Sequence, residues 1–501
     1  MLLLGIDLGT SSVKVSVVDA ATQQCIASVH YPETEFDIIS PQSGWAEQSP
    51  DLWWENVKQA ILKCNATGLY NPLNIAAIGI AYQMHGLVLV DKDQHVLRNS
   101  IIWCDSRAVE IGQEAFHDIG QEKCLYDLLN SPGNFTASKL AWVKRNEPAL
   151  YSKIHKAMLP GDFLSMKFTG DISTTVSALS EGIIWDYRRS NISKDILDYF
   201  GFDESIFPDI QSLFASHGGL KDTVATRLSL KAGIPVSYKA GDQLNNALSL
   251  NVMMPGEVAA TAGTSGVIYG VSDQLEYDQQ SRINSFIHVN HTEAENRVGV
   301  LLCINGAGIS NRYIKNLIGI NRSYSELNNA AAKIEPGADG LLMLPFGNGA
   351  ERMLNNQQIG AHFQNIDFNV HTDAHFVRAV QEGVAFSFRY GLDIMRENGM
   401  NPTIIRAGKA NLFLSDVFTK AFVNSTGVAV EFYDGDGSYG AALGAGIGAK
   451  IYQDAEEAFS NRKPSGCIEP EKHSEYEGIY QEWLAFLNEK LMLVNKQVNI
   501  V

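Results

Sequence analysis

The sequence predicts an α/β protein that consists of two similar domains. Short apolar runs separated by turn residues alternate with stretches of helical periodicity along the whole chain, which is typical of sheets flanked by helices. Two stretches, Ile6–Val13 and Ala262–Val267, each contain a Gly-Thr-Ser turn between two apolar runs. A chain of 501 residues is also too long for one ordinary core and suits two large domains.

The two Gly-Thr-Ser turns and their flanking residues look like two copies of one structural motif. Aligned on the turn, the matching pairs are Gly9/Gly263, Thr10/Thr264, Ser11/Ser265, Val13/Val267, Val17/Val271 and Asp19/Asp273. Glycine permits a tight turn, and such a turn leaves backbone N–H groups and hydroxyls for phosphate oxygens. The alternative is that both stretches are ordinary β-hairpins with glycine-rich loops. Because the two similar turns stand at the starts of equal halves of the chain, we favour two similar domains that bind the phosphates of a nucleotide between their turns. We therefore expect domains over residues 1–246 and 247–501.

In the first half, the apolar runs predict a hairpin of strands Leu2–Asp7 and Val13–Val18. Ser49-Pro50-Asp51 has the N-cap, first-turn proline and acidic residue that begin a helix. Further strands are expected over 75–81, 87–90 and 100–103, and helices over 137–143 and 192–199. The strand Ile234–Lys239 runs into Gly241-Asp242, and a helix over 243–250 follows.

The second half repeats this style. A second hairpin is expected from strands Val258–Ala262 and Val267–Val271. The clearest helix runs from Asp373 to Arg396 and ends before Gly399. Apolar residues recur every four positions on one of its faces, at Phe376, Val380, Val384, Phe388 and Leu392. Strands follow over 403–406 and 429–432, with a helix over 414–423 between them.

The composition argues against several classes of partner. The net charge is −17 and no long basic run occurs, so a nucleic-acid partner is not expected. An acidic protein that handles phosphates needs a metal ion or backbone amides to offset the repulsion. The cysteines lack CxxC spacing, and neither a signal peptide nor a membrane-spanning segment is recognisable. We expect a cytoplasmic protein with reduced thiols and no membrane partner.

One glycine motif suggests a different class of enzyme. Residues 435–440 read Gly-Asp-Gly-Ser-Tyr-Gly, which by itself resembles a dinucleotide fingerprint. Too little βα structure follows it, so a glycine-rich turn that packs a strand against a helix is favoured. The chain contains no GxxxxGK[ST], HExxH or GxSxG motif.

Two aspartates follow predicted strands. Asp242 lies where a strand ends and a helix begins, a place that suits a catalytic carboxylate, although a helix N-cap is the alternative. Asp7 precedes the first Gly-Thr-Ser turn, where a carboxylate can hold Mg²⁺ beside phosphates, although an ordinary turn residue is the alternative.

Two further segments offer polar groups for a polyol. His85, in Met84-His85-Gly86, follows a strand and suits a hydrogen bond to a hydroxyl, although a single histidine is more often structural. Asp105 and Arg107 stand two apart after the strand that ends at Trp103. They form either an ion pair or a polar wall for a sugar.

Together these segments resemble the FGGY family of carbohydrate kinases, within the actin-like ATPase superfamily. The ordered series that carries the resemblance covers nearly the whole chain: residues 7–11, 44–48, 53–54, 83–86, 103–107, 139–142, 241–242, 263–266, 378–379, 382–383 and 440–445. The resemblance implies two actin-like (ribonuclease H-like) domains with a cleft between them. It also implies transfer of a phosphoryl group from ATP, with Mg²⁺, to a small sugar.

The resemblance assigns roles residue by residue. Asp242 matches the catalytic base, and Asp7 matches the carboxylate near Mg²⁺ and the phosphates. The implied sugar-binding residues are Met84, His85, Asp105, Arg107 and Gln243. The implied ATP-binding residues are Gly9, Thr10, Ser11, Gly263, Thr264, Ser265, Gly306, Gly408 and Asn411. Whether the enzyme is a monomer or a homodimer is left open.

The resemblance favours D-xylulose as the acceptor, which would give D-xylulose 5-phosphate, because Gln83-Met84-His85-Gly86 resembles the xylulose kinases. Four positions depart from the family pattern: Gln243, Cys104, Thr175 and Ala407. They leave L-xylulose, ribulose, gluconate and glycerol as alternative acceptors. An actin-like ATPase or sugar sensor that does not phosphorylate sugar is the alternative of another class.

Overall fold

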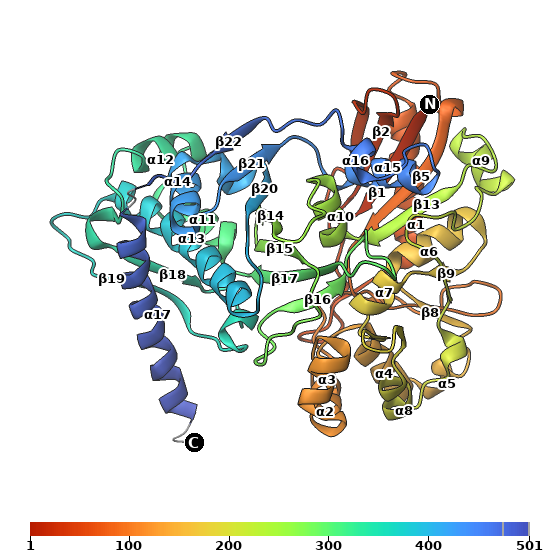
Figure 1. Cartoon of the computed structure of the whole chain (residues 1–501), viewed down its shortest axis with the longest axis horizontal. Helices are drawn as coiled ribbons and strands as arrows, with labels where there is room; N and C mark the ends of the chain where they lie inside the picture. The colour runs from red at the N-terminus through yellow and green to blue at the C-terminus, as the bar shows by residue number, and fades with distance from the viewer. Residues whose placement is uncertain (473–474, 499–501) are drawn as a thin grey trace. The chain divides into compact units, whose positions relative to one another are not determined.

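The computed structural model describes residues 1–472 and 475–498, which form two compact units. The first unit combines residues 1–253, 286–298 and 435–463. The second unit combines residues 254–285 and 299–434 with the chain from Pro464 onward. Each unit is described by itself below, and Figure 1 labels their helices and strands.

The first unit is built on a sheet of five strands in the order β13-β5-β1-β2-β3. The strands are β1 (Leu2–Leu8), β2 (Val13–Asp19), β3 (Cys25–Tyr31), β5 (Ile75–Tyr82) and β13 (Val236–Gly241). Strands β1, β5 and β13 are parallel, and β1-β2-β3 is an antiparallel meander. The predicted first hairpin is confirmed, with Leu8 opposite Val13 across the Gly-Thr-Ser turn.

Helices and short strands complete the first unit. The helices are α1 (Pro50–Asn65), α2 (Val109–Ile119), α3 (Gln121–Leu128), α4 (Thr136–Asn146), α5 (Pro148–Tyr151), α6 (Pro160–Thr169), α7 (Val176–Glu181), α8 (Lys194–Phe200), α9 (Asp222–Leu228), α10 (Asp242–Ser249), α15 (Gly437–Gly448) and α16 (Ala455–Ala458). The short strands are β4 (Glu47–Gln48), β6 (Val88–Val90), β7 (Ser100–Ile101), β8 (Lys156–Met158), β9 (Ser173–Thr174), β10 (Trp185–Asp186), β11 (Asn191–Ile192) and β12 (Asp209–Ile210). The cap predicted for α1 is confirmed, because the Ser49 side chain accepts a hydrogen bond from the Leu52 N–H.

Two predicted elements of this unit are shorter than expected. The strand expected over 100–103 ends at Ile101, and the helix expected over 192–199 begins at Lys194. Ile192 lies in β11 instead, and Ser193 caps the helix. The Ser193 side chain accepts a hydrogen bond from the Ile196 N–H, so the helix begins after this serine and not at Ile192.

The second unit is built on a sheet of seven strands in the order β16-β17-β15-β14-β20-β21-β22. The strands are β14 (Glu257–Ala262), β15 (Gly266–Ser272), β16 (Asn284–Ile287), β17 (Val298–Ile304), β20 (Ile404–Gly408), β21 (Val430–Tyr433) and β22 (Gly466–Ile468). Strands β14 and β15 form the predicted second hairpin, and β14, β20 and β21 are parallel. The order β17-β15-β14-β20-β21 therefore repeats the order β3-β2-β1-β5-β13 of the first unit.

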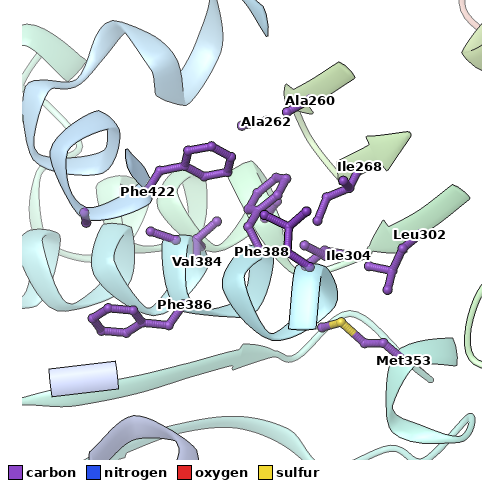
Figure 2. Close-up of a cluster of buried hydrophobic side chains, with 14 of the residues drawn as sticks. Ala260, Ala262, Ile268, Leu302, Ile304, Met353, Val384, Phe386, Phe388 and Phe422 are labelled. Atoms are coloured by element: carbon purple, nitrogen blue, oxygen red, sulfur yellow. The ribbon is translucent and has the colours of Figure 1, made fainter. Parts of the chain in front are cut away.

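The long helix α13 (Asp373–Glu397) is the centre of the core of the second unit. Figure 2 shows Val384 and Phe388 on the side of α13 that faces Ile268 and Leu302, whereas Phe386 leaves the helix on the opposite side. The predicted one-faced pattern is therefore incomplete, because nearly every residue from 374 to 388 is buried. The remaining elements are α11 (Ala307–Ile318), α12 (Tyr324–Ala331), α14 (Asp416–Thr426), α17 (Tyr476–Val498), β18 (Leu342–Phe346) and β19 (Gly360–Gln364).

The division of the chain differs from the single cut predicted after residue 246. The main break falls between Met253 and Met254, and residues 286–298 and 435–463 join the first unit. The physical reason is α15, which packs along β1, β5 and β13 (Figure 1). A Cβ on Gly5 or Gly79 would overlap a carbonyl oxygen of α15, so these strands need glycine to admit the helix. The glycines of 435–440 thus begin a packed helix, as favoured over a dinucleotide site.

No helix within the described ranges is long and apolar enough to cross a membrane.

Candidate active site

Two carboxyl groups of the first unit lie at the carboxyl ends of β1 and β13, the two parallel strands that flank β5. Asp7 of β1 stands opposite Ala81 of β5, and Gly241, the last residue of β13, stands opposite Tyr82 on the other side of β5. Asp242 follows directly as the first residue of α10, whose N-cap is Gly241. Asp242 is therefore not the N-cap of α10, and its carboxyl group hydrogen-bonds the adjacent Gln243 instead.

The electrostatics of these two groups are unusual. The pKa of Asp7 is raised to about 6, mainly by burial, with a smaller contribution from the charge of Asp436 and an opposing one from Lys14. Burial also raises the pKa of Asp242 to about 7, and the charge of Asp7 adds to this effect. By exposed area both side chains are half-buried, so they remain within reach of a ligand. A carboxylate with a pKa near neutrality suits proton transfer.

The first Gly-Thr-Ser turn lies beside these carboxylates and is fixed by hydrogen bonds. The Gly9 N–H donates to the Ser12 carbonyl at 3.0 Å, and the Gln48 side chain donates to the Thr10 carbonyl at 2.8 Å. Gln48 in turn accepts from the Gln83 amide at 2.9 Å. The hydroxyl of Thr10 accepts from the indole of Trp103, which is 51% exposed, at 2.9 Å.

Met84 and His85 lie next to this group, just beyond β5. Met84 is buried, and His85 holds a left-handed backbone conformation with φ of 61°. Its Nδ1 lies 2.9 Å from the carbonyl oxygen of Glu181 and must therefore donate, which assigns the lone pair to Nε2 in the neutral ring. Lys139 donates from Nζ to the His85 carbonyl at 2.9 Å. Such a strained residue between two polar anchors is typical of a ligand site.

The aromatic rings of Phe135 and Phe286 pack against His85, at 4.8 and 5.3 Å between ring centroids. Burial lowers the pKa of Lys139 to about 7. The surroundings of His85 are thus an apolar wall with a few convergent polar groups, which is the usual make-up of a small-molecule pocket.

Asp105 and Arg107 form a buried ion pair rather than a wall of this pocket. Nη2 of Arg107 donates to Asp105 at 2.7 Å, and Nη1 lies 2.8 Å from a carboxyl oxygen of Glu47. The guanidinium stacks on Trp45 at 3.8 Å from the ring centroid, and Asp105 also accepts from the Ala46 N–H. Both side chains are about 1% exposed or less. The ion-pair alternative is therefore favoured over direct contact with a sugar.

The second Gly-Thr-Ser turn lies in the second unit against the start of α11. The Gly308 N–H donates to the Gly263 carbonyl at 2.9 Å, and the Ile309 N–H donates to the Thr264 carbonyl at 3.0 Å. A Cβ on Gly308 would overlap the Gly263 carbonyl oxygen, so this close approach requires glycine. Gly306 is the N-cap of α11 and packs against the Pro345 carbonyl in the same way.

A cavity of about 590 Å³ opens beside this second turn, entirely within the second unit. It is lined by residues 262–264 of the turn, by 308, 309, 311 and 312 of α11, by 324, 325, 328, 329 and 332, and by 411, 412 and 414–416. The amide of Gln381 braces its wall, donating to Asn328 and accepting from the Ser415 hydroxyl. A cavity of this size with amide, hydroxyl and backbone groups suits a nucleotide.

Comparisons with known proteins agree with this geometry. The family model for the N-terminal domain of the FGGY family of carbohydrate kinases matches residues 2–249. A xylulose kinase of Lactococcus lactis subsp. lactis is 30% identical over 505 residues, which cover 96% of this chain and 95% of that protein. The chain belongs to the FGGY family of carbohydrate kinases.

Solved structures of FGGY kinases have the same fold. A xylulose kinase of Brucella ovis superposes with a TM-score of 0.87 at 27% identity, covering 98% of this chain and 100% of that chain. A gluconate kinase of Lactobacillus acidophilus superposes with a TM-score of 0.87 at 20% identity, covering 98% of both chains, and shows the fold alone. The predicted pair of actin-like domains is thereby confirmed.

The structure of this kinase brings some of the predicted site residues together and leaves others apart. In the first unit it brings together Asp7, Asp242, Met84, His85 and the first turn. In the second unit, Gly263, Thr264 and Asn411 line the cavity. Gly306 and Gly408 do not line it, and neither does Ser265.

Sequence reasoning missed three residues that border these sites. Trp103 was part of a recognised motif, but nothing in that motif indicates that its indole reaches Thr10. Gly308 follows two residues after a predicted site glycine, so a second glycine in the same turn was a usable signal. Glu181 carries no local signal, since it is the last residue of a short helix.

Proposed function

We propose that this kinase transfers the terminal phosphoryl group of ATP to a ketopentose, D-xylulose above all, with Asp242 as the general base. The observation that carries the proposal is the half-buried carboxyl of Asp242, whose pKa of about 7 lies between the values of an ordinary acid and a strong base. A base of this kind takes the proton of a hydroxyl group as the phosphorus–oxygen bond forms.

The acceptor is positioned by the groups around Asp242. The lone pair on Nε2 of His85 accepts a hydrogen bond from a sugar hydroxyl, and the thioether of Met84 packs against the carbon skeleton. Gln243, next to the base and half-buried, offers an amide to a second hydroxyl. Positioning of the two reactants accounts for most of what a protein contributes to phosphoryl transfer.

ATP is assigned to the cavity of the second unit. The base and ribose fit among residues 308–329 and 411–416, and the second Gly-Thr-Ser turn offers N–H groups to the phosphates. The first turn, Gly9–Ser11, offers the same groups on the acceptor side. These donors are needed because the chain carries a net charge of −17, which repels a nucleotide.

The carboxylates of the first unit fit a magnesium ion. Asp7, Asp242 and Asp436 would offer hard oxygen ligands, and burial together with the charge of Asp436 raises the pKa of Asp7, a cost that a bound cation would offset. Asp7 is the proposed ligand, with phosphate oxygens completing the shell. Bound Mg²⁺ would neutralise negative charge on the phosphates. The described groups of three close ligands lie elsewhere, at Asp91/Asp93/His95 and Asp127/Asp186/Asp195, so this site depends on the nucleotide.

The choice of acceptor is tested by a panel of sugars in a coupled assay of ADP release. Relatives called xylulose kinases support D-xylulose, whereas structural neighbours include a gluconate kinase. We expect D-xylulose to have the highest kcat/KM among D-xylulose, L-xylulose, ribulose, gluconate and glycerol. A higher value for gluconate or glycerol would refute the assignment, and ATP hydrolysis without any acceptor would favour an ATPase. A homodimer and a cytoplasmic location stay predictions.

A further inference from the structure

Glu181 is a buried carboxyl group that the proposed chemistry does not use. It is the last residue of α7, and its exposed fraction is 1%. Neither carboxyl oxygen makes a hydrogen bond of ordinary geometry to any described residue. Burial raises the pKa of this group well above its usual value, the charge of Asp242 adds to the shift, and the Tyr82 hydroxyl opposes it. An unsatisfied buried carboxyl is costly and calls for a reason.

The carboxyl group points to the residue before the catalytic base. A Cβ on Gly241 would overlap Oε2 of Glu181 and crowd Cγ of Met84, so both side chains converge on the space beside Gly241. The main-chain carbonyl of Glu181 is the partner of Nδ1 of His85. Glu181 therefore lies next to Gly241, which precedes Asp242, and it is also close to the side chains of Met84 and His85.

The segment around Glu181 is held in place on both sides. Ser177 donates to the Ile287 carbonyl at 2.8 Å, and Ser180 accepts from the Ile287 N–H at 2.9 Å. Just after α7, Ile183 has a φ of 56°, which is strained for a β-branched residue. A merely space-filling role does not explain this arrangement, because an apolar side chain would fill the same volume without the cost of burying a carboxyl group.

We propose that Glu181 is a specificity-determining residue of the sugar site, whose carboxyl group hydrogen-bonds a hydroxyl group of the acceptor. The flexible Met84 side chain, which shares the space beside Gly241, moves aside as the acceptor enters. The inference rests on the proposed function and deepens it, since it adds a second recognition group next to Asp242. It implies an acceptor with a hydroxyl near the one that is phosphorylated.

The test uses the full chain with Glu181→Ala, Glu181→Gln and a control, Thr174→Val. Thr174 also carries a buried side-chain oxygen without a partner, but it lies just before the other end of α7. Steady-state kinetics and calorimetric binding are measured with the best ketopentose and with its monodeoxy analogues. We expect Glu181→Ala to raise KM and Kd for the parent sugar about tenfold, with a smaller loss for Glu181→Gln, whose amide still bonds. KM for ATP stays unchanged, and Thr174→Val resembles the wild type.

The decisive result is the dependence on the analogue. For one monodeoxy sugar, which lacks the hydroxyl that Glu181 binds, the variants and the wild type should have equal affinity. A loss that is the same for every analogue, or a change only in Tm, would overturn the inference. If Glu181→Ala does not fold, Glu181→Gln is judged by the same criterion. A wild-type enzyme that neither binds nor phosphorylates any ketopentose would refute the proposed function first, and this inference with it.

Discussion

At the scale of single residues, the carboxyl groups of the first unit are the most informative feature. Asp7 lies in β1 and Asp242 directly follows β13, and these two strands flank β5, with Asp7 opposite Ala81 and Gly241 opposite Tyr82. Their raised pKa values result mainly from burial, to which the charge of Asp436 adds at Asp7 and the charge of Asp7 adds at Asp242. In the proposed function, a cation at Asp7 and a sugar hydroxyl at Asp242 would compensate for this cost.

Asp242→Asn should reduce kcat by about 10²- to 10⁴-fold, because the amide keeps the shape of the side chain but cannot take a proton. Sugar and ATP affinities, measured by calorimetry, should change little. At pH 8 we also expect a higher Tm than that of the wild type, because the substitution removes a desolvated charge. The surface variant Asp93→Asn is the control. Turnover near the wild-type rate would mean that Asp242 is not the base.

The pH dependence of the wild type follows from the same group. Asp242 must be ionised to accept the proton, and its pKa is raised to about 7. As pH falls through this value, the carboxylate takes up a proton and kcat/KM for the sugar should fall, approaching tenfold per pH unit well below it. A profile measured from pH 5 to 9 tests this. Constant activity down to pH 5 would contradict it.

At the scale of elements, the loop after β7 shows how a charged motif becomes structural. Arg107→Ala removes one partner of a buried ion pair and should lower the free energy of unfolding by about 3–5 kcal/mol. Arg145→Ala, which breaks an exposed pair with Glu114, should cost about 0–1 kcal/mol and serves as the control. Denaturant unfolding measures both. An Arg107→Ala variant of unchanged stability but with a raised KM for the sugar would mean that Arg107 contacts the sugar.

The contact between α11 and the second Gly-Thr-Ser turn allows a separate test of where ATP binds. Gly308→Ala would push the start of α11 away from the Gly263 carbonyl and deform the cavity wall. We expect KM for ATP to rise about tenfold or more, while sugar binding measured without nucleotide is unchanged. Gly478→Ala, in the helix α17 with open space at the Cβ position, is the control. Unchanged ATP kinetics would place the nucleotide elsewhere.

Elements with local signals were predictable from the sequence. Both hairpins, the cap of α1 and the end of α13 before Gly399 depend on turn and cap residues that act within a few positions. The burial of Asp105 and Arg107 was not predictable, because it depends on Glu47, Trp45 and Trp142, which the fold brings from two distant segments. The role of Glu181 was not predictable for the same reason, because its neighbours Tyr82 of β5 and Gly241 of β13 are distant from it in the sequence.

At the scale of the whole molecule, the proposed function assigns the sugar to the first unit and ATP to the second, and phosphoryl transfer demands that the two ligands come into contact. We therefore expect the two units to close when both ligands are bound, which would also exclude water as a competing acceptor. Solution scattering with xylulose and a non-hydrolysable ATP analogue should give a smaller radius of gyration than without ligands. Identical curves with both ligands shown to be bound would contradict closure.

The position of α15 in the chain has a consequence for synthesis on the ribosome. The sheet of the first unit is covered by α15, which is translated after residues 254–285 and 299–434 of the second unit. At 5–20 residues per second the nascent first unit waits roughly 10–40 s for this helix, with Gly5 and Gly79 uncovered. We therefore expect the first unit to complete its fold only after most of the second unit has been synthesised.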